Sequence, residues 1–229
     1  EKSFTSALAS HNRDQWLQKL CAIFGAFVMK YILGTKGRMT QVFDAEGRVF
    51  PATVITATPI MVTHVRTPEK DGYTAVQVGM GAKKPKRASQ AEKGHFKELA
   101  VPKVTREVRD MTGERGASID LSIFKEGDVV AVSAISKAKG FQGVVKRHGF
   151  HGDMRTHGRK HTERTGGSIG AGGRAGGRVA KGMRMPGRMG GVRVTVKNLK
   201  VLQVNPAEHT IVISGAVPGI PGALVEIRG

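Results

Sequence analysis

Four histidines lie close together in this sequence and could bind a metal. His148, His151, His157 and His161 fall within 14 residues, and the last two have the i, i+4 spacing of a zinc-binding pair. Their neighbours are strongly cationic and include no cysteine, which opposes a divalent metal. We therefore expect no metal site and no cofactor. We interpret the histidines as hydrogen-bond donors that gain charge beside phosphate groups.

A glycine-rich stretch follows, with part of the spacing of a nucleotide-binding loop. Residues 170–175 fit the pattern G-x-G-x-x-A, but that fingerprint must follow a buried strand and open a helix, and polar, basic residues precede it here. Residues 177–182 have the gap of a phosphate-binding loop, yet Met183 stands where that loop requires lysine. Neither pattern is a nucleotide site, and no small-molecule substrate is expected.

Both motifs belong to a longer basic stretch, residues 137–193. It holds fourteen Lys or Arg against Asp153 and Glu163, a net charge of +12 out of +19 for the chain, and 16 of the 31 glycines. Dense glycine raises the entropy lost on ordering, and the positive charges repel one another. The stretch therefore cannot fold by burying itself. A polyanion would supply the counter-charge and the ordering energy, and RNA is the leading candidate.

Residue types within this stretch suit contact with RNA. Glycine lets a backbone thread between RNA helices and donate N–H groups to phosphates, while the arginine fork makes bidentate phosphate contacts. The methionines at 183, 185 and 189 would fill irregular gaps against nucleobases or the protein body. We expect Phe141 to be a packing anchor, with base stacking as the alternative. With Val144 and Val145 it would seat one helical turn on the body.

The elements that must hold this stretch are β-strands. We predict a mainly β fold: a β-barrel body with a small helical insert and a long, irregular, basic internal loop. A hairpin turn is expected at residues 44–47 and a short helix within residues 90–99. The predicted strands are 39–43, 48–58, 60–66, 73–78, 104–108, 129–135, 192–204, 210–214 and 224–227.

These elements divide the chain into parts. Residues 29–136 would form the first part of the barrel, with an insert at about 83–100, and residues 192–229 would complete it. Residues 137–191, which we call the arm, leave and rejoin this body. Two interpretations stay open for the basic tract at residues 83–87, a solvated loop or a second patch that contacts phosphates.

Residues 1–28 lack the β pattern and form an N-terminal extension. Apolar residues between Trp16 and Phe27 have helical spacing, which predicts a short helix on the body or on a partner. An organelle-targeting remnant is the alternative. The longest apolar run, residues 20–29, is well short of the ~20 residues that a membrane span requires, so no membrane partner is expected.

Six segments of the chain match motifs of one known family. They are Gly34–Phe43, Lys139–Gly143, Lys146–His148, Gly167–Gly170, Lys181–Gly190 and Gly215–Gly219. These motifs resemble those of the bacterial-type third protein of the large ribosomal subunit and come in that family's order, and the similarity covers about residues 29–229.

The resemblance implies a β-barrel on the subunit surface and an internal loop that penetrates large-subunit (23S-type) ribosomal RNA towards the peptidyl transferase centre. It also implies support of early assembly, and neighbouring large-subunit proteins, among them proteins fourteen and nineteen. The tip would lie near residues 168–178. There, residues 171–176 replace a Gln/Asn-bearing tip that can carry a methylated Gln in some relatives, so this modification is not expected. The expected location is a bacterial cytoplasmic ribosome, with a mitochondrial or plastid ribosome as the alternative.

A nucleoid protein or RNA chaperone with a basic arm is the alternative function. It would bind duplex DNA about as well as ribosomal RNA. An enzyme is not expected, because no Ser–His–acid set can be placed together from the sequence. The residues expected to contact ribosomal RNA are Lys83, Lys84, Lys86, Arg87, Lys137, Lys139, Lys146, Arg147, His148, Arg155, His157, Arg159, Lys160, His161, Arg164, Ser168, Arg174, Arg178, Lys181, Arg184, Arg188 and Arg193.

Overall fold

Strands dominate the fold, as predicted. The structure, a computed structural model, describes residues 29–44, 46–97, 99–109, 111–170 and 176–229. The helix predicted between Trp16 and Phe27 lies outside these residues. No helix in the described part is long and apolar enough to cross a membrane.

The strands are β1 (Tyr31–Phe43), β2 (Val49–Thr56), β3 (Ile60–Arg66), β4 (Ala75–Ala82), β5 (Pro102–Arg109), β6 (Ser118–Ile119), β7 (Val129–Ile135), β8 (Gly140–Gln142), β9 (Gly187–Met189), β10 (Arg193–Asn205), β11 (Thr210–Ser214) and β12 (Leu224–Arg228). The helices are α2 (Pro68–Asp71), α3 (Gln90–Phe96) and α4 (Val144–His148), with 3-10 turns η1 (Pro85–Arg87) and η2 (Leu121–Ile123).

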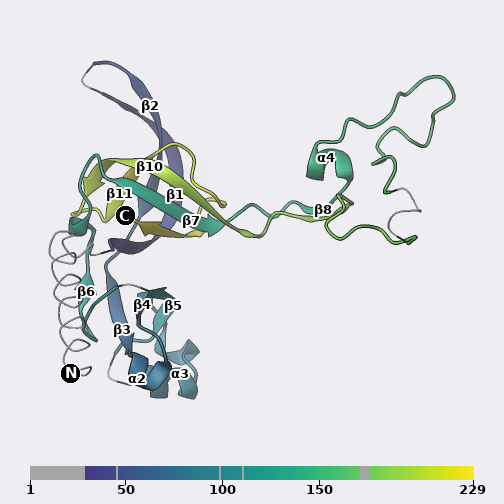
Figure 1. Cartoon of the computed structure of the whole chain (residues 1–229). Coiled ribbons are helices and arrows are strands. Elements are labelled where there is room, and N and C mark those ends of the chain that lie inside the picture. The colour runs from purple at the N-terminus through teal and green to yellow at the C-terminus, as the bar shows by residue number, and fades with distance from the viewer. Residues whose placement is uncertain (1–28, 45, 98, 110, 171–175) are drawn as a thin grey trace, which may run out of the picture.

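Six antiparallel strands close a barrel in the order β1-β12-β7-β10-β11-β2. Its interior is aliphatic: Ile211 and Ile213 on β11 and Val225 and Ile227 on β12 are fully buried. Closure leaves the barrel without a free sheet edge. Three of the strands precede the arm and three follow it. The prediction that distant halves of the chain complete one barrel is therefore confirmed, and Figure 1 shows the arm leaving this barrel at the end of β7.

The predicted hairpin joins β1 to β2. Its turn follows Asp44, and Gly47 takes the left-handed conformation (φ 76°) that the turn requires. Asp44 N–H donates to the carbonyl of Arg48 across the turn, at 2.9 Å. In Figure 1 the distal half of this hairpin reaches beyond the barrel.

A second sheet lies beside the barrel, in the order β5-β4-β3-β6 (Figure 1). The predicted strands 60–66, 73–78 and 104–108 belong to it and not to the barrel, a separation that the strand pattern did not reveal. Alternating residues predict a strand equally well in either sheet, because partners are chosen only when the chain folds. The predicted helix in residues 90–99 is α3, which begins at a capping box formed by Ser89 and Glu92.

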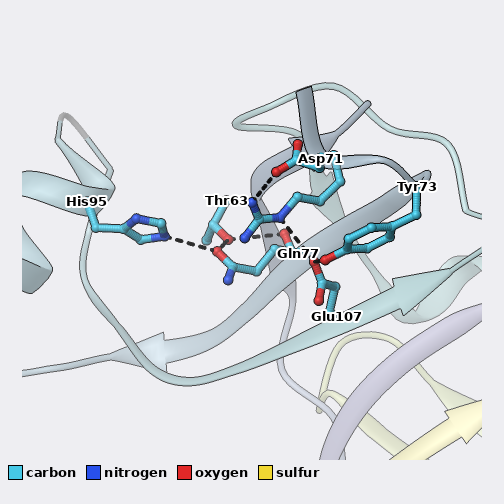
Figure 2. Close-up of polar contacts among 7 residues, drawn as sticks. Thr63, Asp71, Tyr73, Gln77, His95 and Glu107 are labelled. Atoms are coloured by element: carbon cyan, nitrogen blue, oxygen red, sulfur yellow. Dashed lines mark hydrogen bonds and ion pairs between the residues drawn. The ribbon is translucent and has the colours of Figure 1, made fainter. Parts of the chain in front are cut away.

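A polar network ties this sheet together (Figure 2). Arg66 on β3 contacts Asp71 of α2 at 2.5 Å and Glu107 of β5 at 3.2 Å. The Tyr73 hydroxyl donates to the same Glu107 carboxylate at 3.0 Å. The hydrogen bond from Arg66 holds the pKa of Asp71 below its usual range. These contacts join three elements across the solvent-facing side of the sheet, and we assign them a structural role.

An ion pair fastens the start of β1 to the turn before β7. Lys30 Nζ lies 2.5 Å from Asp128 Oδ2, and the Lys125 N–H donates to the same oxygen at 2.9 Å. Both contacts favour the ionised carboxylate, with the Lys30 bond the larger cause, so the pKa of Asp128 is lowered.

Asp128→Asn should therefore destabilise the protein in a pH-dependent way. A depressed carboxyl pKa stabilises the fold above the unfolded value, about 4, and this stability is lost as the pH falls through the folded value. The difference in unfolding free energy between the parent and Asp128→Asn should be present at pH 7 and shrink towards pH 3, as measured by urea denaturation. Glu126→Gln, an exposed change in the same turn, should show no such difference. A pH-independent loss in Asp128→Asn would contradict the assigned cause.

Candidate nucleic-acid interface

The two roots of the arm are paired strands of the barrel. Ile135 at the end of β7 pairs with Arg193 at the start of β10. Beyond them the Ser136 N–H donates to the carbonyl of Val192 and the Lys139 N–H to that of Met189, both at 2.9 Å. Strands β8 and β9 then pair to form a two-stranded stalk. The barrel thus fixes the direction in which the arm leaves it (Figure 1).

The neck of the arm, formed by the adjacent segments 135–139 and 188–193, contains a close approach of its two chains that admits only glycine. Gly190 has φ 74°, and a Cβ built there would lie 2.0 Å from the carbonyl oxygen of Lys137. That distance is far inside van der Waals contact, and the obstacle is backbone, which cannot move aside as a flexible side chain can. Gly182, further out, also has a positive φ (87°), but nothing lies within 4 Å of its Cβ position.

Gly190→Ala should therefore separate the two chains of the neck, whereas Gly182→Ala should cost only the left-handed conformation, roughly 1–2 kcal/mol. Hydrogen exchange on the full chain tests this. The amide of Lys139, bonded to Met189 across the neck, should lose protection in Gly190→Ala and keep it in Gly182→Ala. Equal protection of this amide in both variants would contradict the importance of the close approach between Gly190 and Lys137.

Beyond the stalk, residues 143–150 pack against residues 183–186, and this small cluster contains the predicted helical turn. Helix α4 ends at His148 and is capped by Gly149 in the left-handed conformation. Arg147 Nη1 donates to the carbonyl of Met185 at 2.6 Å, and His148 Nε2 lies 3.1 Å from the same oxygen. Val144 is buried. A Cβ built at Gly166 would lie 3.2 Å from the Phe150 ring, so the chain passes close to this ring. The contacts with Met185 join the outgoing chain to the returning one.

Two predictions about this turn are wrong. The turn does not sit on the barrel, and Phe141 is not a packing anchor, since this residue is 77% exposed. The reason is the stalk: β8 and β9 carry the chain away from the barrel before the helix begins (Figure 1). Val144 therefore packs against the arm itself. Phe141 pairs with Arg188 in the stalk and faces solvent, so base stacking remains open for its ring.

The distal arm has no core. Among its described residues, 151–170 and 176–182, none is buried. Both acids of the arm form ion pairs within the arm. Asp153 pairs with Arg159, which lowers the pKa of the Asp153 carboxyl, and Glu163 lies 3.5 Å from Arg155. The backbone also bridges the loop, where Asp153 N–H donates to the carbonyl of Glu163 at 3.1 Å. Polar contacts, and not apolar burial, give this part its shape.

The structure sorts the predicted contact residues into two groups. Some are engaged within the protein: Lys83 with Glu92, Arg147 and His148 with Met185, Arg155 and Arg159 with the arm's acids, Arg184 over the Phe150 ring at 5.1 Å, and Arg193 with Glu226. Others are exposed and form no ion pair within the described part of the chain. In the arm these are Lys137, Lys139, Lys146, Lys160, Arg164, Arg178, Lys181 and Arg188, which we call the free arm cations.

The remaining predicted residues lie elsewhere. His157, His161 and Ser168 are exposed in the distal arm, where the Ser168 side chain forms hydrogen bonds with the backbone of Gly170. Arg174 lies outside the described residues. Lys84, Lys86 and Arg87 are exposed at η1 beside α3, and the structure does not bring them together with the arm. Whether this tract contacts phosphates stays a prediction.

Sequence reasoning missed a charge cluster at the arm's root. The side chain of Glu226 on β12 is only 7% exposed and contacts Arg193 at 2.5 Å, Arg106 of the second sheet at 3.0 Å and Arg228 at 3.9 Å. Burial and the charge of Glu226 raise the pKa of Tyr31, which lies under Arg228. The only sequence signal was an acidic residue within an apolar strand. Two of its three partners, Arg106 and Arg193, come from distant segments, and Arg228 lies on the same strand.

Comparisons with known proteins agree on one family. Residues 105–228 match the family model described as Ribosomal protein L3. The large ribosomal subunit protein uL3 of Acidothermus cellulolyticus is 48% identical over 207 residues, which cover 87% of this chain and 92% of that protein. The uL3 of Desulfitobacterium hafniense is 45% identical over 209 residues, 89% of this chain and 97% of that protein. The uL3 of Metamycoplasma arthritidis is 44% identical over 206 residues, 87% of this chain and 75% of that protein. The chain therefore belongs to the ribosomal protein L3 family.

Proposed function

We propose that this protein is a structural, non-enzymatic constituent of the large ribosomal subunit, and that its arm binds 23S-type ribosomal RNA. The observation that carries the proposal is an arm with eight free cations and no buried residue in its described distal part, held at both roots by the barrel. Such a segment needs an external polyanion to balance its charge and to order it. The barrel fixes only the place and direction in which the arm leaves the body.

The arrangement of paired and free cations supports this assignment. Arg147, Arg155 and Arg159 are occupied by a carbonyl or carboxylate of the arm and hold its shape. The free arm cations project from that shape and would contact phosphates. Exposed Met154, Ile169 and Val179 are spaced along the same chain and would pack on nucleobases that single-stranded RNA leaves unstacked.

The finer parts of the proposal follow from family membership. The tip, near residues 168–178, would extend towards the peptidyl transferase centre, where RNA performs the chemistry. The body, residues 29–136 and 192–229, would lie on the subunit surface, beside neighbours such as proteins fourteen and nineteen. Binding would support early assembly. The ribosome would be a cytoplasmic bacterial one, with an organellar ribosome as the alternative, and residues 1–28 would be an extension outside these roles.

Competition binding separates this function from that of a nucleoid protein. The full chain, bound to labelled 23S-type RNA at physiological salt, should be displaced by unlabelled 23S-type RNA and far less by duplex DNA of equal nucleotide concentration. Equal displacement would favour general polyanion binding.

A shortened arm tests the role in assembly. Replacing residues 168–178 by two glycines spares Gly166, which packs against Phe150. The purified variant should keep the parent's thermal unfolding midpoint, since none of the described residues removed is buried. A strain with only this variant should accumulate immature large subunits on sucrose gradients. A normal gradient profile would refute the role assigned to the tip.

A further inference from the structure

A pocket of about 650 Å³ lies where the arm joins the barrel. The two chains of the neck contribute Ile135 and Lys137 on one side and Arg188 on the other. Ile220, in the loop before β12, and Arg106, on β5 of the second sheet, complete its walls. The pocket is thus formed by three parts of the molecule that meet only in the folded chain. We call it the root pocket.

The root pocket has an excess of positive charge. Four cations line it, Arg106, Lys137, Arg188 and Arg193, against the single carboxylate of Glu226. That carboxylate is already bonded to Arg106 and Arg193. Within the described residues no acid pairs with Lys137 or Arg188. A ligand for this pocket should therefore bring negative charge to the neck side, where these two cations stand.

The root pocket also has aliphatic walls. Ile135 and Ile220 are 58% and 57% exposed, although both line the same pocket. A small anion would leave these side chains in water, and an apolar peptide would leave the cations without a partner. A nucleotide satisfies both, because the flat faces of its base can lie against aliphatic side chains and its phosphate is an anion. Unstacked RNA bases also stack on arginine guanidinium planes, and three arginines line this pocket.

We propose that the root pocket receives one unstacked nucleotide of ribosomal RNA, with its base against Ile135 and Ile220 and its phosphate at Lys137 and Arg188. The proposal rests on the proposed function, since RNA that surrounds the arm must also pass its root. The pocket volume falls in the range of ordinary ligand sites. The carboxylate of Glu226 is occupied by guanidinium groups, so it positions the arginines and does not read the base.

Site-specific crosslinking tests the position of the nucleotide. Ile220 is replaced by the photoreactive amino acid p-benzoylphenylalanine in the full chain, and large subunits assembled with it are irradiated. Crosslinks should map to one or two adjacent ribosomal RNA nucleotides. Crosslinks to a ribosomal protein, or none, would overturn the proposal. The same probe at Lys181 reports on the arm. RNA crosslinks at 181 but not at 220 would refute the root pocket alone, and their absence at both positions would also count against the proposed function.

A charge variant tests whether the pocket holds the base. Ile220→Glu places a carboxylate where the base would pack, and Val129→Glu is the matched control, since Val129 is also 57% exposed but starts β7 at its other end. In assembled subunits, chemical probing should show reactivity at the crosslinked nucleotide raised at least about fivefold by Ile220→Glu, because the base loses an apolar contact of the size that burial of part of one aliphatic side chain supplies. Reactivity should be unchanged in Val129→Glu. Equal reactivity in both variants would overturn the proposal.

Discussion

Replacing Lys139, Lys146, Arg178 and Lys181 by glutamine should weaken binding to 23S-type RNA by about 10²–10³-fold at about 0.15 M monovalent salt. All four are free arm cations, exposed and without an ion pair in the described part of the chain. Each phosphate that a cation neutralises releases condensed counterions into solution, and this entropy gain is the main source of affinity. Their removal costs affinity without removing any contact that holds the arm together.

The dependence on salt distinguishes this mechanism from a loss of folding. Log K should fall with log salt concentration about 3 units less steeply in the quadruple variant, or roughly 0.7–0.9 per cation removed. Filter binding or fluorescence anisotropy over a range of KCl concentrations measures the slope. The control removes four exposed lysines of the body, Lys70, Lys93, Lys103 and Lys125, with the same change in net charge. Equal slopes for the two variants would show that only net charge matters and would refute the assigned interface.

Glu226→Gln should lower the free energy of unfolding by about 2–3 kcal/mol. The carboxylate is nearly buried and bonds Arg193 at the arm's root and Arg106 on the second sheet, so its loss leaves two guanidinium groups uncompensated. Fully buried pairs cost more when broken. Here the arginine side chains are 40–51% exposed, and water compensates them in part.

Urea denaturation of the full chain without RNA measures this loss. Glu208→Gln, in the exposed turn between β10 and β11, is the control and should change stability by less than about 0.5 kcal/mol. Because Arg193 begins β10, Glu226→Gln should also reduce hydrogen-exchange protection at Ser136, whose amide is bonded to Val192. Equal stability of the two variants would contradict the central place of this carboxylate.

Local patterns predicted the individual strands well. The run at residues 129–135 became β7 and that at residues 210–214 became β11, with the predicted bounds. Both runs are short, rich in β-branched residues and bounded by turns, so their local preference and their final environment agree. The turn at Gly47 is likewise local, because a positive φ is a property of the residue itself.

Strand pairing and side-chain contacts could not be predicted from these local patterns. The run at residues 60–66 gave the same signal as the barrel strands but pairs in a second sheet, and Phe141 resembled an anchor but faces water. The contact between Glu226 and Arg106 joins residues 120 positions apart. A single sequence contains no periodicity that encodes such a pairing.

The sequence by itself determined the chemistry of this protein. A basic, glycine-rich arm without apolar periodicity cannot bury a core, whatever the rest of the chain does, because composition alone fixes its charge and its entropy. Only the tertiary structure decided which cations are available. Arg155, Arg159 and Arg193 are occupied by carboxylates, while Lys139 and Lys181 remain free. The pairs of Arg155 and Arg159 depend on the folded path of the arm, whereas the pair of Arg193 with Glu226, like the root pocket, joins distant segments that meet only once the barrel has closed.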